Sequence, residues 1–404
     1  MVTRVLYVEN GMHGGGSAES LLQLINALDK AQYEPHVLLT SDIPVKDRLL
    51  TMGVPTVVAK SICFSRPESL FASIVFKLCS GINAYLGGSL CRLTSVTENI
   101  STSVLQMYLK KLVRTKKIDV VHTNNNAHRD YWAIKAASEA GVPCVVHLRS
   151  FHAMGFGRCK AKKINVMASA MIGYSQSILD FWQGKGLEVE KLNLIYNAIS
   201  QVQNDPADLV AEFDLSKDTP VIGIVGRVID ERGHDFLLKA IPAVLDKVPD
   251  LKLIIVGGAD EREKAQLQDL VAELGIDDAV IWAGHRSNGK AIIAALNAIV
   301  LPYTIEPFGR TLLEAWRLGT PVVLSRVGHI EKIVEHNRNA LLFDREKPEA
   351  LAEQLIRVFL EPDLANKLVS EGKVECEARF SVVAQAASVQ TLYESVLHPS
   401  TLNS

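Results

Sequence analysis

Short apolar runs alternate with helical patterns along almost the whole chain, and this alternation constrains the fold most strongly. The runs lie at residues 3–8, 36–40, 56–59, 119–123, 143–148 and 170–175, and then at 221–225, 253–256, 280–283, 298–301, 321–325 and 340–343. Runs this short predict buried strands, and the helical patterns between them supply the crossovers that parallel strands require. We therefore predict an α/β chain with two tandem Rossmann-like, doubly wound domains facing across a cleft.

A polar, helix-poor stretch at residues 197–219 separates the two series of strands. A chain of 404 residues has room for two or three domains. We predict an N-terminal domain over residues 1–198 and a C-terminal domain over 199–380. Residues 381–404 are predicted to form a helix and a polar tail that packs back on the N-terminal domain.

The charge is distributed unevenly although the formal net charge is only −2. Residues 1–198 carry 22 Lys and Arg against 14 Asp and Glu, and residues 60–117 alone carry nine against two. The segment 60–117 holds two amphipathic helical patterns, and the first is too polar to span a bilayer because Lys77 interrupts it. Two interpretations stay open: a domain insertion that packs on the sheet, or a helix pair that docks on an anionic membrane surface.

The six cysteines are scattered and form no C-x-x-C pair, which predicts free thiols in a reducing compartment. The apolar run at the N-terminus is too short for the core of a signal peptide. We therefore expect a cytoplasmic protein.

Two glycine-containing loops follow predicted first strands. Gly14, Gly15 and Gly16 follow the strand at residues 3–8, and a loop with Gly226, Arg227, Arg232 and Gly233 follows the strand at 221–225. The spacing fits neither the dinucleotide fingerprint nor the P-loop. Glycines let backbone N–H groups approach an anion, and two arginines can grip a diphosphate. The alternative is a flexible turn and a pair of surface arginines.

The segment 306–325 combines two glutamates with a predicted helix start. Glu306 and Glu314 lie eight positions apart on either side of a turn at Gly309. We expect the helix to begin at Arg310 or Thr311, so that backbone amides of Gly309, Arg310 and Thr311 meet a phosphate. The carboxylates then suit the hydroxyl groups of the same ligand.

Residues 306–325 resemble the signature of glycosyltransferase family 4, whose members are retaining enzymes with two Rossmann-like domains, the GT-B fold. The shared pattern is two glutamates separated by seven residues, followed by a small-residue turn that leads to Pro-Val-Val. The loop at 226–233 is similar to the family's Gly-Arg…Lys-Gly loop, with Arg232 in place of the lysine. The loop at 14–19 is similar to its N-terminal glycine-rich loop. A departure is Lys332, which stands where the family usually has a glutamate.

The resemblance implies roles for individual residues. The catalytic residues that it implies are His147, Arg227, Arg232 and Glu306. The donor-binding residues that it implies are Gly15, Gly16, Gly309, Arg310, Thr311 and Glu314. Weaker candidates for the acceptor side are His122, His128 and Arg149.

The resemblance also implies an activity: transfer of a sugar from a nucleotide-diphosphate sugar to a saccharide or lipid-linked saccharide, in cell-surface polysaccharide or glycolipid synthesis. No Asp-x-Asp triplet occurs, so we expect no metal and no other cofactor. We expect no nucleic-acid partner, and a cytoplasmic enzyme that is peripheral on the inner face of the membrane. Two alternatives stay open: a sugar-nucleotide epimerase of the same architecture, and a non-catalytic nucleotide-sugar- or glycan-binding protein.

Overall fold

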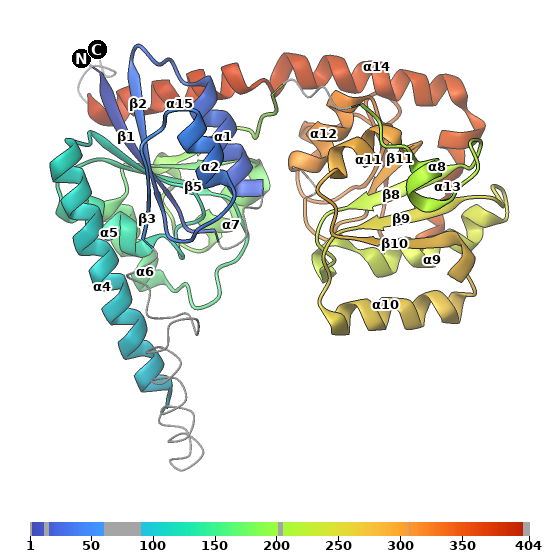
Figure 1. Cartoon of the computed structure of the whole chain (residues 1–404), viewed down its shortest axis with the longest axis horizontal. Helices are drawn as coiled ribbons and strands as arrows, with labels where there is room; N and C mark the ends of the chain where they lie inside the picture. Colours follow the sequence, from blue (N-terminus) through green and yellow to red (C-terminus); the bar gives the residue numbers. More distant parts are fainter. Residues whose placement is uncertain (1, 12–15, 60–89, 201–204, 307, 399–404) are drawn as a thin grey trace. The chain divides into compact units, whose positions relative to one another are not determined.

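The computed structural model describes residues 2–11, 16–59, 90–200, 205–306 and 308–398, with only the backbone for 90–101 (Figure 1). These residues form two compact units. Unit 1 comprises Met1–Tyr196 and Gln385–Ser404, and unit 2 comprises Asn197–Ala384. The boundary lies after Tyr196, two residues before the boundary predicted from the sequence.

Unit 1 is built on a sheet of parallel strands in the order β3-β2-β1-β4-β5-β6-β7. The order reverses between β1 and β4, which is the place where doubly wound sheets bind ligands, outside the carboxyl ends of the strands. The strands are β1 (Thr3–Glu9), β2 (Tyr33–Leu39), β3 (Thr56–Val58), β4 (Val120–Thr123), β5 (Cys144–Leu148), β6 (Ala170–Gly173) and β7 (Leu192–Leu194).

The sequence did not predict β7. This strand has three residues with the polar Asn193 in the middle, and it lies at the edge of the sheet beside β6. The strand is short and only partly buried, and Asn193 interrupts its apolar residues, so it lacks the continuous apolar run that marked the other strands.

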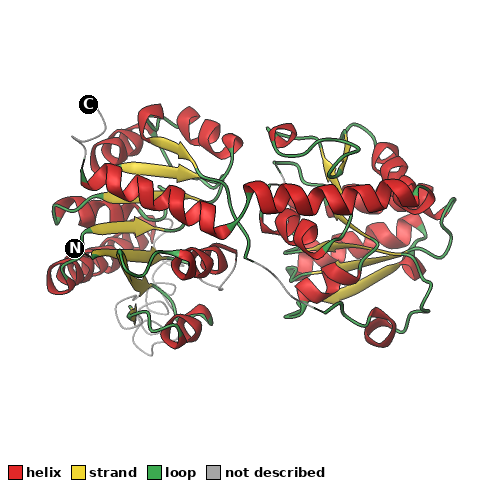
Figure 2. Cartoon of the chain, turned by 90° about the horizontal axis from the view of Figure 1, so that it is seen from above, coloured by secondary structure: helices red, strands yellow, loops and turns green. Residues whose placement is uncertain are grey.

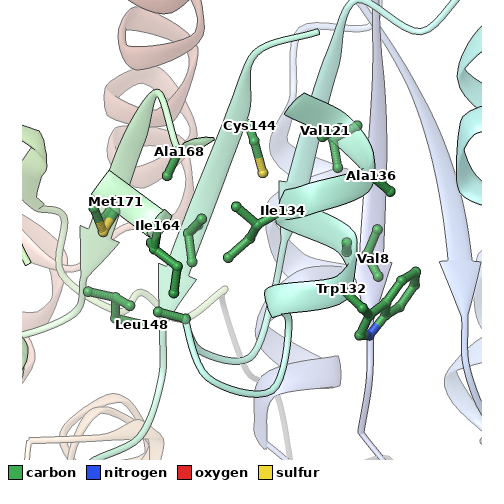
Figure 3. Packing of buried hydrophobic residues seen from close by; sticks show 14 of the residues in the cluster. Val8, Val121, Trp132, Ile134, Ala136, Cys144, Leu148, Ile164, Ala168 and Met171 are labelled. Carbon is green, nitrogen blue, oxygen red and sulfur yellow. The ribbon is translucent and has the colours of Figure 1, made fainter. Parts of the chain in front are cut away.

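Helices cover both faces of this sheet, as Figure 2 shows. They are α1 (Gly16–Ala27), α2 (Val45–Thr51), α4 (Leu90–Lys116), α5 (Tyr131–Glu139), α6 (Arg158–Met167), α7 (Gln176–Gly184), η1 (Val189–Lys191) and α15 (Val382–Leu397). On one face, Ile134 of α5 and Ile164 of α6 pack with Cys144 and Leu148 of β5 (Figure 3). This core fixes where the loops after β4 and β5 leave the sheet.

Helix α4 contains the second apolar stripe of segment 60–117. Leu105, Leu109 and Val113 are buried in the core of unit 1, and α4 packs against α5. The described part of this stripe therefore faces the domain core, as the ordinary-insertion interpretation expects. The basic residues Lys111, Arg114, Lys116 and Lys117 are exposed. The first amphipathic pattern, over residues 71–86, lies outside the described residues.

Helix α15 packs on unit 1 through one face, with Gln385, Ala386, Val389 and Tyr393 buried. The side-chain amide of Gln385 donates to the carbonyl oxygen of Tyr196 at 2.8 Å. The last helix of the chain therefore belongs to the first unit, although the whole of unit 2 lies between them in sequence.

Unit 2 repeats the architecture with parallel strands in the order β10-β9-β8-β11-β12-β13. The strands are β8 (Val221–Val225), β9 (Lys252–Val256), β10 (Val280–Gly284), β11 (Ala298–Leu301), β12 (Val322–Ser325) and β13 (Leu341–Phe343). The order reverses between β8 and β11. The helices are α8 (Leu209–Phe213), η2 (Asp230–Arg232), α9 (His234–Leu245), α10 (Glu261–Leu274), η3 (Asp277–Ala279), α11 (Gly289–Ala295), α12 (Arg310–Leu318), η4 (Ile330–Lys332), α13 (Pro348–Leu360) and α14 (Pro362–Arg379).

Within the described residues, no helix is both long and apolar enough to cross a membrane.

Candidate functional site

The loops after β8 and β11 of unit 2 meet at the point where the strand order reverses. The carbonyl oxygen of Glu231 accepts a hydrogen bond from the backbone amide of Thr304 at 2.9 Å. The side chain of Arg345 donates to the carbonyl oxygen of Pro302. The structure thus brings together the loop with Arg227 and Arg232 and the loop that leads to Glu306, which the sequence analysis had assigned to one ligand.

Arg232 is held against the end of β8. Its Nη1 donates to the carbonyl oxygen of Val225 at 3.0 Å and to the hydroxyl of Tyr303 at 2.7 Å. The guanidinium group also lies 5.0 Å from the centre of the Tyr303 ring. These contacts use one end of the guanidinium, and its Nε and Nη2 groups donate to none of the described residues. Arg232 is therefore fixed in place with donors left for a ligand.

Gly226 is required by this arrangement. It has a φ of +137°, and a Cβ atom built on it would lie 1.9 Å from Nη1 of Arg232. Gly233 has a φ of +67°, and a Cβ atom there would lie 2.0 Å from the carbonyl oxygen of Pro302. Gly226 thus permits the close approach of Arg232, and Gly233 permits that of the backbone at Pro302. A side chain at either position would leave no room for this approach.

The side chain of Arg227 is not held in place as that of Arg232 is. Its side chain is exposed, and it forms no hydrogen bond or ion pair with any described residue. The resemblance implies the same role for the two arginines, whereas the fold anchors only Arg232.

Glu306 is buried, with 6% of its surface exposed. Its Oε2 accepts a hydrogen bond from the backbone amide of His329 at 2.7 Å. His329 follows Gly328, which has a φ of +63° and turns the chain after β12. This contact links the loop after β11 to the loop after β12, so the carboxylate is oriented by the backbone at the same edge of the sheet.

Helix α12 begins at Arg310, in agreement with the predicted start, and Gly309 is its N-cap with no side-chain capping bond. The first turn of a helix leaves backbone N–H groups without partners inside the helix. Nη2 of Arg310 donates to Oε1 of Glu314 at 3.0 Å, and both side chains are little exposed, at 12% and 13%. Glu314 thus lies one turn inside α12 beside a positive charge. Thr311 lies in the same first turn and is half-buried.

His234 is a residue of this region that the sequence analysis did not single out. It is the first residue of α9 and is buried, directly after Gly233. Burial and the charge of Arg232 lower the pKa of its imidazole to about 4, so the ring is neutral at pH 7. Only its position next to the Gly-rich loop could have indicated it in the sequence.

The site residues predicted in unit 1 have mixed outcomes. Gly15 lies outside the described residues, and Gly16 is the exposed first residue of α1. His147 lies inside β5 with no exposed surface, while Arg149, two residues further on, is half-buried at the carboxyl edge. Nη2 of Arg149 contacts Nδ1 of His147 at 3.2 Å.

This contact defines the state of His147. Arginine only donates hydrogen bonds, so Nδ1 accepts and the ring proton resides on Nε2. Burial, with the nearby charge of Arg149, holds the pKa of His147 well below its usual value. His147 is thus neutral. It stacks on His122, with ring centres 5.6 Å apart.

A buried polar cluster at the switch point of unit 1 was missed from the sequence. The carboxylate of Glu9, at the end of β1, accepts hydrogen bonds from the amide of Gly11 at 2.8 Å and from the side chains of Asn124 and Asn125. Oδ1 of Asn124 in turn accepts from Nε of Arg149 at 2.8 Å. Because Glu9 ends an apolar strand, the sequence pattern showed only where the strand stopped and not that its last side chain turned inward.

The two Rossmann-like units define the class of the protein: it has the GT-B fold of glycosyltransferases. A crystal structure of HepE from Anabaena, in complex with UDP and glucose, superposes with a TM-score of 0.76 over 97% of this chain and 100% of HepE, at 20% identity. Residues 207–375 match the family described as glycosyl transferases group 1. These matched residues lie within unit 2.

Curated relatives carry glycosyltransferase names. An uncharacterized glycosyltransferase of Methanocaldococcus jannaschii is 26% identical over 66% of this chain and 72% of its own length. The lipopolysaccharide core biosynthesis glycosyltransferase LpsE of Rhizobium meliloti is 28% identical over 42% of this chain and 48% of its own length. The D-inositol 3-phosphate glycosyltransferase of Corynebacterium jeikeium is 34% identical over 46% of each chain. The chain thus spans about half the length of the last two relatives.

Proposed function

We propose that this protein is a retaining glycosyltransferase of family 4 that transfers a sugar from a nucleotide-diphosphate sugar to a saccharide or lipid-linked saccharide. The observation that carries the proposal is the anchored Arg232, whose contacts with Val225 and Tyr303 join the two loops at the switch point of unit 2. A guanidinium held at one end and open at the other suits a diphosphate leaving group.

The proposed roles in unit 2 follow from charge. Arg227 and Arg232 bind the diphosphate and stabilise the negative charge that develops on it as the bond between C1 of the sugar and the phosphate oxygen breaks. The first-turn amides of α12 bind the same group. Glu314 accepts hydrogen bonds from the ribose hydroxyls, and Glu306 accepts them from the sugar.

Retention of the anomeric configuration requires that the acceptor oxygen bonds to C1 on the face from which the diphosphate leaves. The leaving diphosphate takes the bonding electron pair, and its oxygen receives the proton of the acceptor hydroxyl. The step is balanced without a protein nucleophile, and we assign none.

The proposals for the donor and for the biological role are supported by similar proteins. HepE, which shares the fold, was crystallised with UDP and glucose, and this supports a UDP-hexose as the first donor to test. LpsE is named for lipopolysaccharide core biosynthesis, which supports a role in cell-surface glycan synthesis.

Membrane association is proposed through segment 60–117. The exposed residues Lys111, Arg114, Lys116 and Lys117 near the end of α4 support an electrostatic contact with anionic lipid. Wild type should float with anionic vesicles at low salt, and a variant with these four residues changed to Gln should not. Flotation of both proteins to the same extent would contradict this contact.

The test of the donor site combines binding with turnover. UDP-, GDP-, ADP- and CMP-sugars are compared by thermal stabilisation, since a ligand that binds only the folded state raises its stability. Arg227→Ala and Glu314→Ala should each abolish transfer, and NMR of the first product should show the anomeric configuration of the donor. Full activity in either variant, or an inverted product, would overturn the proposal.

The same experiment separates the two alternatives. An epimerase would convert a nucleotide sugar to its epimer in the absence of an acceptor, and a binding protein would be stabilised by the nucleotide sugar without forming any product.

A further inference from the structure

A second group of charged side chains lies in unit 1, on the loops that follow β4 and β5. Residues 140–179 contain five Lys and Arg residues and no Asp or Glu. Lys160 of this basic stretch lies against His128, which belongs, with Arg129, to the loop before α5.

Lys160, in the first turn of α6, is half-buried and has no carboxylate partner among the described residues. Its Nζ donates to Nδ1 of His128 at 3.1 Å and to the carbonyl oxygen of His128 at 3.4 Å, and it lies 4.8 Å from the centre of the Tyr131 ring. Because an ammonium group only donates, Nδ1 of His128 accepts, and the ring presents an N–H at Nε2. Both side chains therefore offer donors and no acceptor.

The loop that carries His128 and Arg129 is rigidly built. Oδ1 of the buried Asn126 accepts from the backbone amides of His128 and Arg129 at 3.0 and 2.8 Å, and its Nδ2 donates to Ser150 at 2.8 Å. The ring of Phe156 packs edge-on against the His128 ring at 6.0 Å. The backbone of these two residues and the ring of His128 are therefore set before any ligand binds.

The charge of this group is not neutralised. Arg129, His152 and Arg158 are exposed and form no ion pair with any described residue. Arg129, His152 and Lys160 all lower the pKa of His128, after the larger effect of burial, and no carboxylate opposes them. The carboxyl of the neighbouring Asp130 is buried and accepts hydrogen bonds from the amides of Asn125 and Asn126.

We propose that His128, Arg129, His152 and Lys160 form a binding site for a phosphate group carried by the acceptor. The site lies at the carboxyl edge of the sheet of unit 1. Lys160 and His128 present adjacent donors, and Arg129 and His152 lie near enough to act electrostatically on His128. Donors with uncompensated positive charge are the chemistry that recognises a phosphate. The inference rests on the proposed function, because it assigns to unit 1 the acceptor of that reaction and gives the acceptor a chemical class.

The phosphate belongs either to a soluble sugar phosphate or to a lipid headgroup, and the experiment distinguishes the two sources. The probes are inorganic phosphate and vesicles of phosphatidylcholine with and without phosphatidic acid. The variants are Arg129→Gln and the double variant Arg129→Gln/Lys160→Gln. The matched control is Lys162→Gln, which removes an exposed charge two positions along α6, about 200° around the helix.

Binding is measured by calorimetry with UDP present in excess, so that the diphosphate site of unit 2 is filled before phosphate is added. Wild type should bind phosphate, and the double variant should bind it about tenfold or more weakly, because two charge-assisted contacts are lost. Lys162→Gln should bind as wild type does. Arg129 has no described side-chain contact, so Arg129→Gln tests the site even if the double variant fails to fold.

Cys159 supplies a local readout. It is exposed in the first turn of α6 between Arg158 and Lys160. Phosphate should slow alkylation of Cys159 by iodoacetamide in wild type and in Lys162→Gln, as followed by mass spectrometry of the peptide, and should have no effect in the double variant.

The calorimetry, alkylation and flotation measurements distinguish failure of the phosphate site from failure of the proposed function. Equal phosphate affinity in wild type and the double variant, or alkylation of Cys159 that phosphate leaves unchanged, would overturn the site. Absence of binding of UDP, GDP and ADP alike would count against the proposed function and leave the alkylation result valid. Flotation is measured in proteins that also carry the four changes to Gln near the end of α4, so that those residues do not contribute. Flotation only with phosphatidic acid vesicles, lost when Arg129→Gln/Lys160→Gln is added, assigns the phosphate to lipid. Phosphate binding without flotation assigns it to a soluble acceptor.

Discussion

At the scale of single residues, the structure separates side chains that look equivalent in the sequence. Arg227 and Arg232 lie in one loop, yet only Arg232 is anchored, through Val225 and Tyr303. In unit 1, His147 is enclosed in a strand while Arg149 lies at its end. Charge and residue type predicted candidates, and burial decides which of them reaches a ligand.

Gly226→Ala should displace Arg232 and thereby weaken the candidate diphosphate site. The new Cβ atom would lie 1.9 Å from Nη1 of Arg232, at a φ of +137° that alanine rarely adopts. We expect a loss of about 1–3 kcal/mol in the free energy of unfolding and weaker nucleotide binding. Urea denaturation and UDP calorimetry measure the two effects. Gly258→Ala is the control for stability, since no heavy atom lies within 4 Å of its added Cβ atom. Unchanged UDP affinity in Gly226→Ala would show that the position of Arg232 is unimportant.

Asp130→Asn should alter the pH dependence of stability. Burial raises the pKa of the Asp130 carboxyl from 3.8 to about 7, so the folded chain holds this proton more tightly than the unfolded chain. The resulting stabilisation is complete below pH 3.8 and is lost as the pH rises to about 7. Relative to wild type, the variant should therefore gain stability between pH 5 and pH 8. If the urea midpoints of wild type and Asp130→Asn differ by the same amount at every pH in this range, the raised pKa of Asp130 is contradicted.

At the scale of elements, the ends of helices and strands carry the chemistry. The N-terminus of α12 lies beside Glu314, and the ends of β8 and β11 supply the arginine and the turn. Helix α15, in contrast, attaches the end of the chain to unit 1. The hydroxyl of its Tyr393 contacts Nδ1 of His122 at 2.5 Å and the hydroxyl of Tyr7 at 2.9 Å.

Tyr393→Phe should loosen α15. The variant keeps the ring but leaves the buried His122 and Tyr7 groups without this partner, which costs about 1–3 kcal/mol in the free energy of unfolding. Hydrogen exchange of the α15 amides and urea denaturation measure the effect. Thr391→Val, at an exposed position of the same helix, should behave as wild type. Equal exchange rates in wild type and Tyr393→Phe would mean that the hydrogen bonds do not hold the helix.

At the scale of the whole molecule, two series of strands form two sheets with the same order over six strands, and the first sheet has β7 as a seventh strand. The net charge of −2 combines a basic N-terminal half and an acidic C-terminal half. The basic residues of the first half lie in segment 60–117 and also around α6, where the proposed phosphate site lies.

Removal of divalent metal should leave transfer unchanged. The proposed stabilisation of the diphosphate uses arginines and helix amides, so an excess of EDTA should lower the initial rate of sugar transfer by less than about twofold. The control is a second EDTA sample to which Mg²⁺ has been restored. A rate that falls with EDTA and recovers with Mg²⁺ would contradict a metal-independent mechanism.

The sequence by itself determined the architecture. Continuous apolar runs such as residues 221–225 mark strands buried on both faces, and Gly309 with Arg310 marks the start of a helix. These are local signals, read within one or two turns of chain. The edge strand β7 lacked such a signal and was missed.

Only the tertiary structure decided which side chains act together. Glu9 and Arg149 lie 140 positions apart, and Asn124 connects them because β1, β4 and β5 are neighbours in the sheet. Lys160 meets His128 in the same way. Long-range contacts of this kind determine which candidate side chains are buried and which nitrogen of His147 accepts a hydrogen bond. They also determine that the charge near α6 is uncompensated. No local pattern encodes them, because sheet order and packing set the distances between residues far apart in sequence.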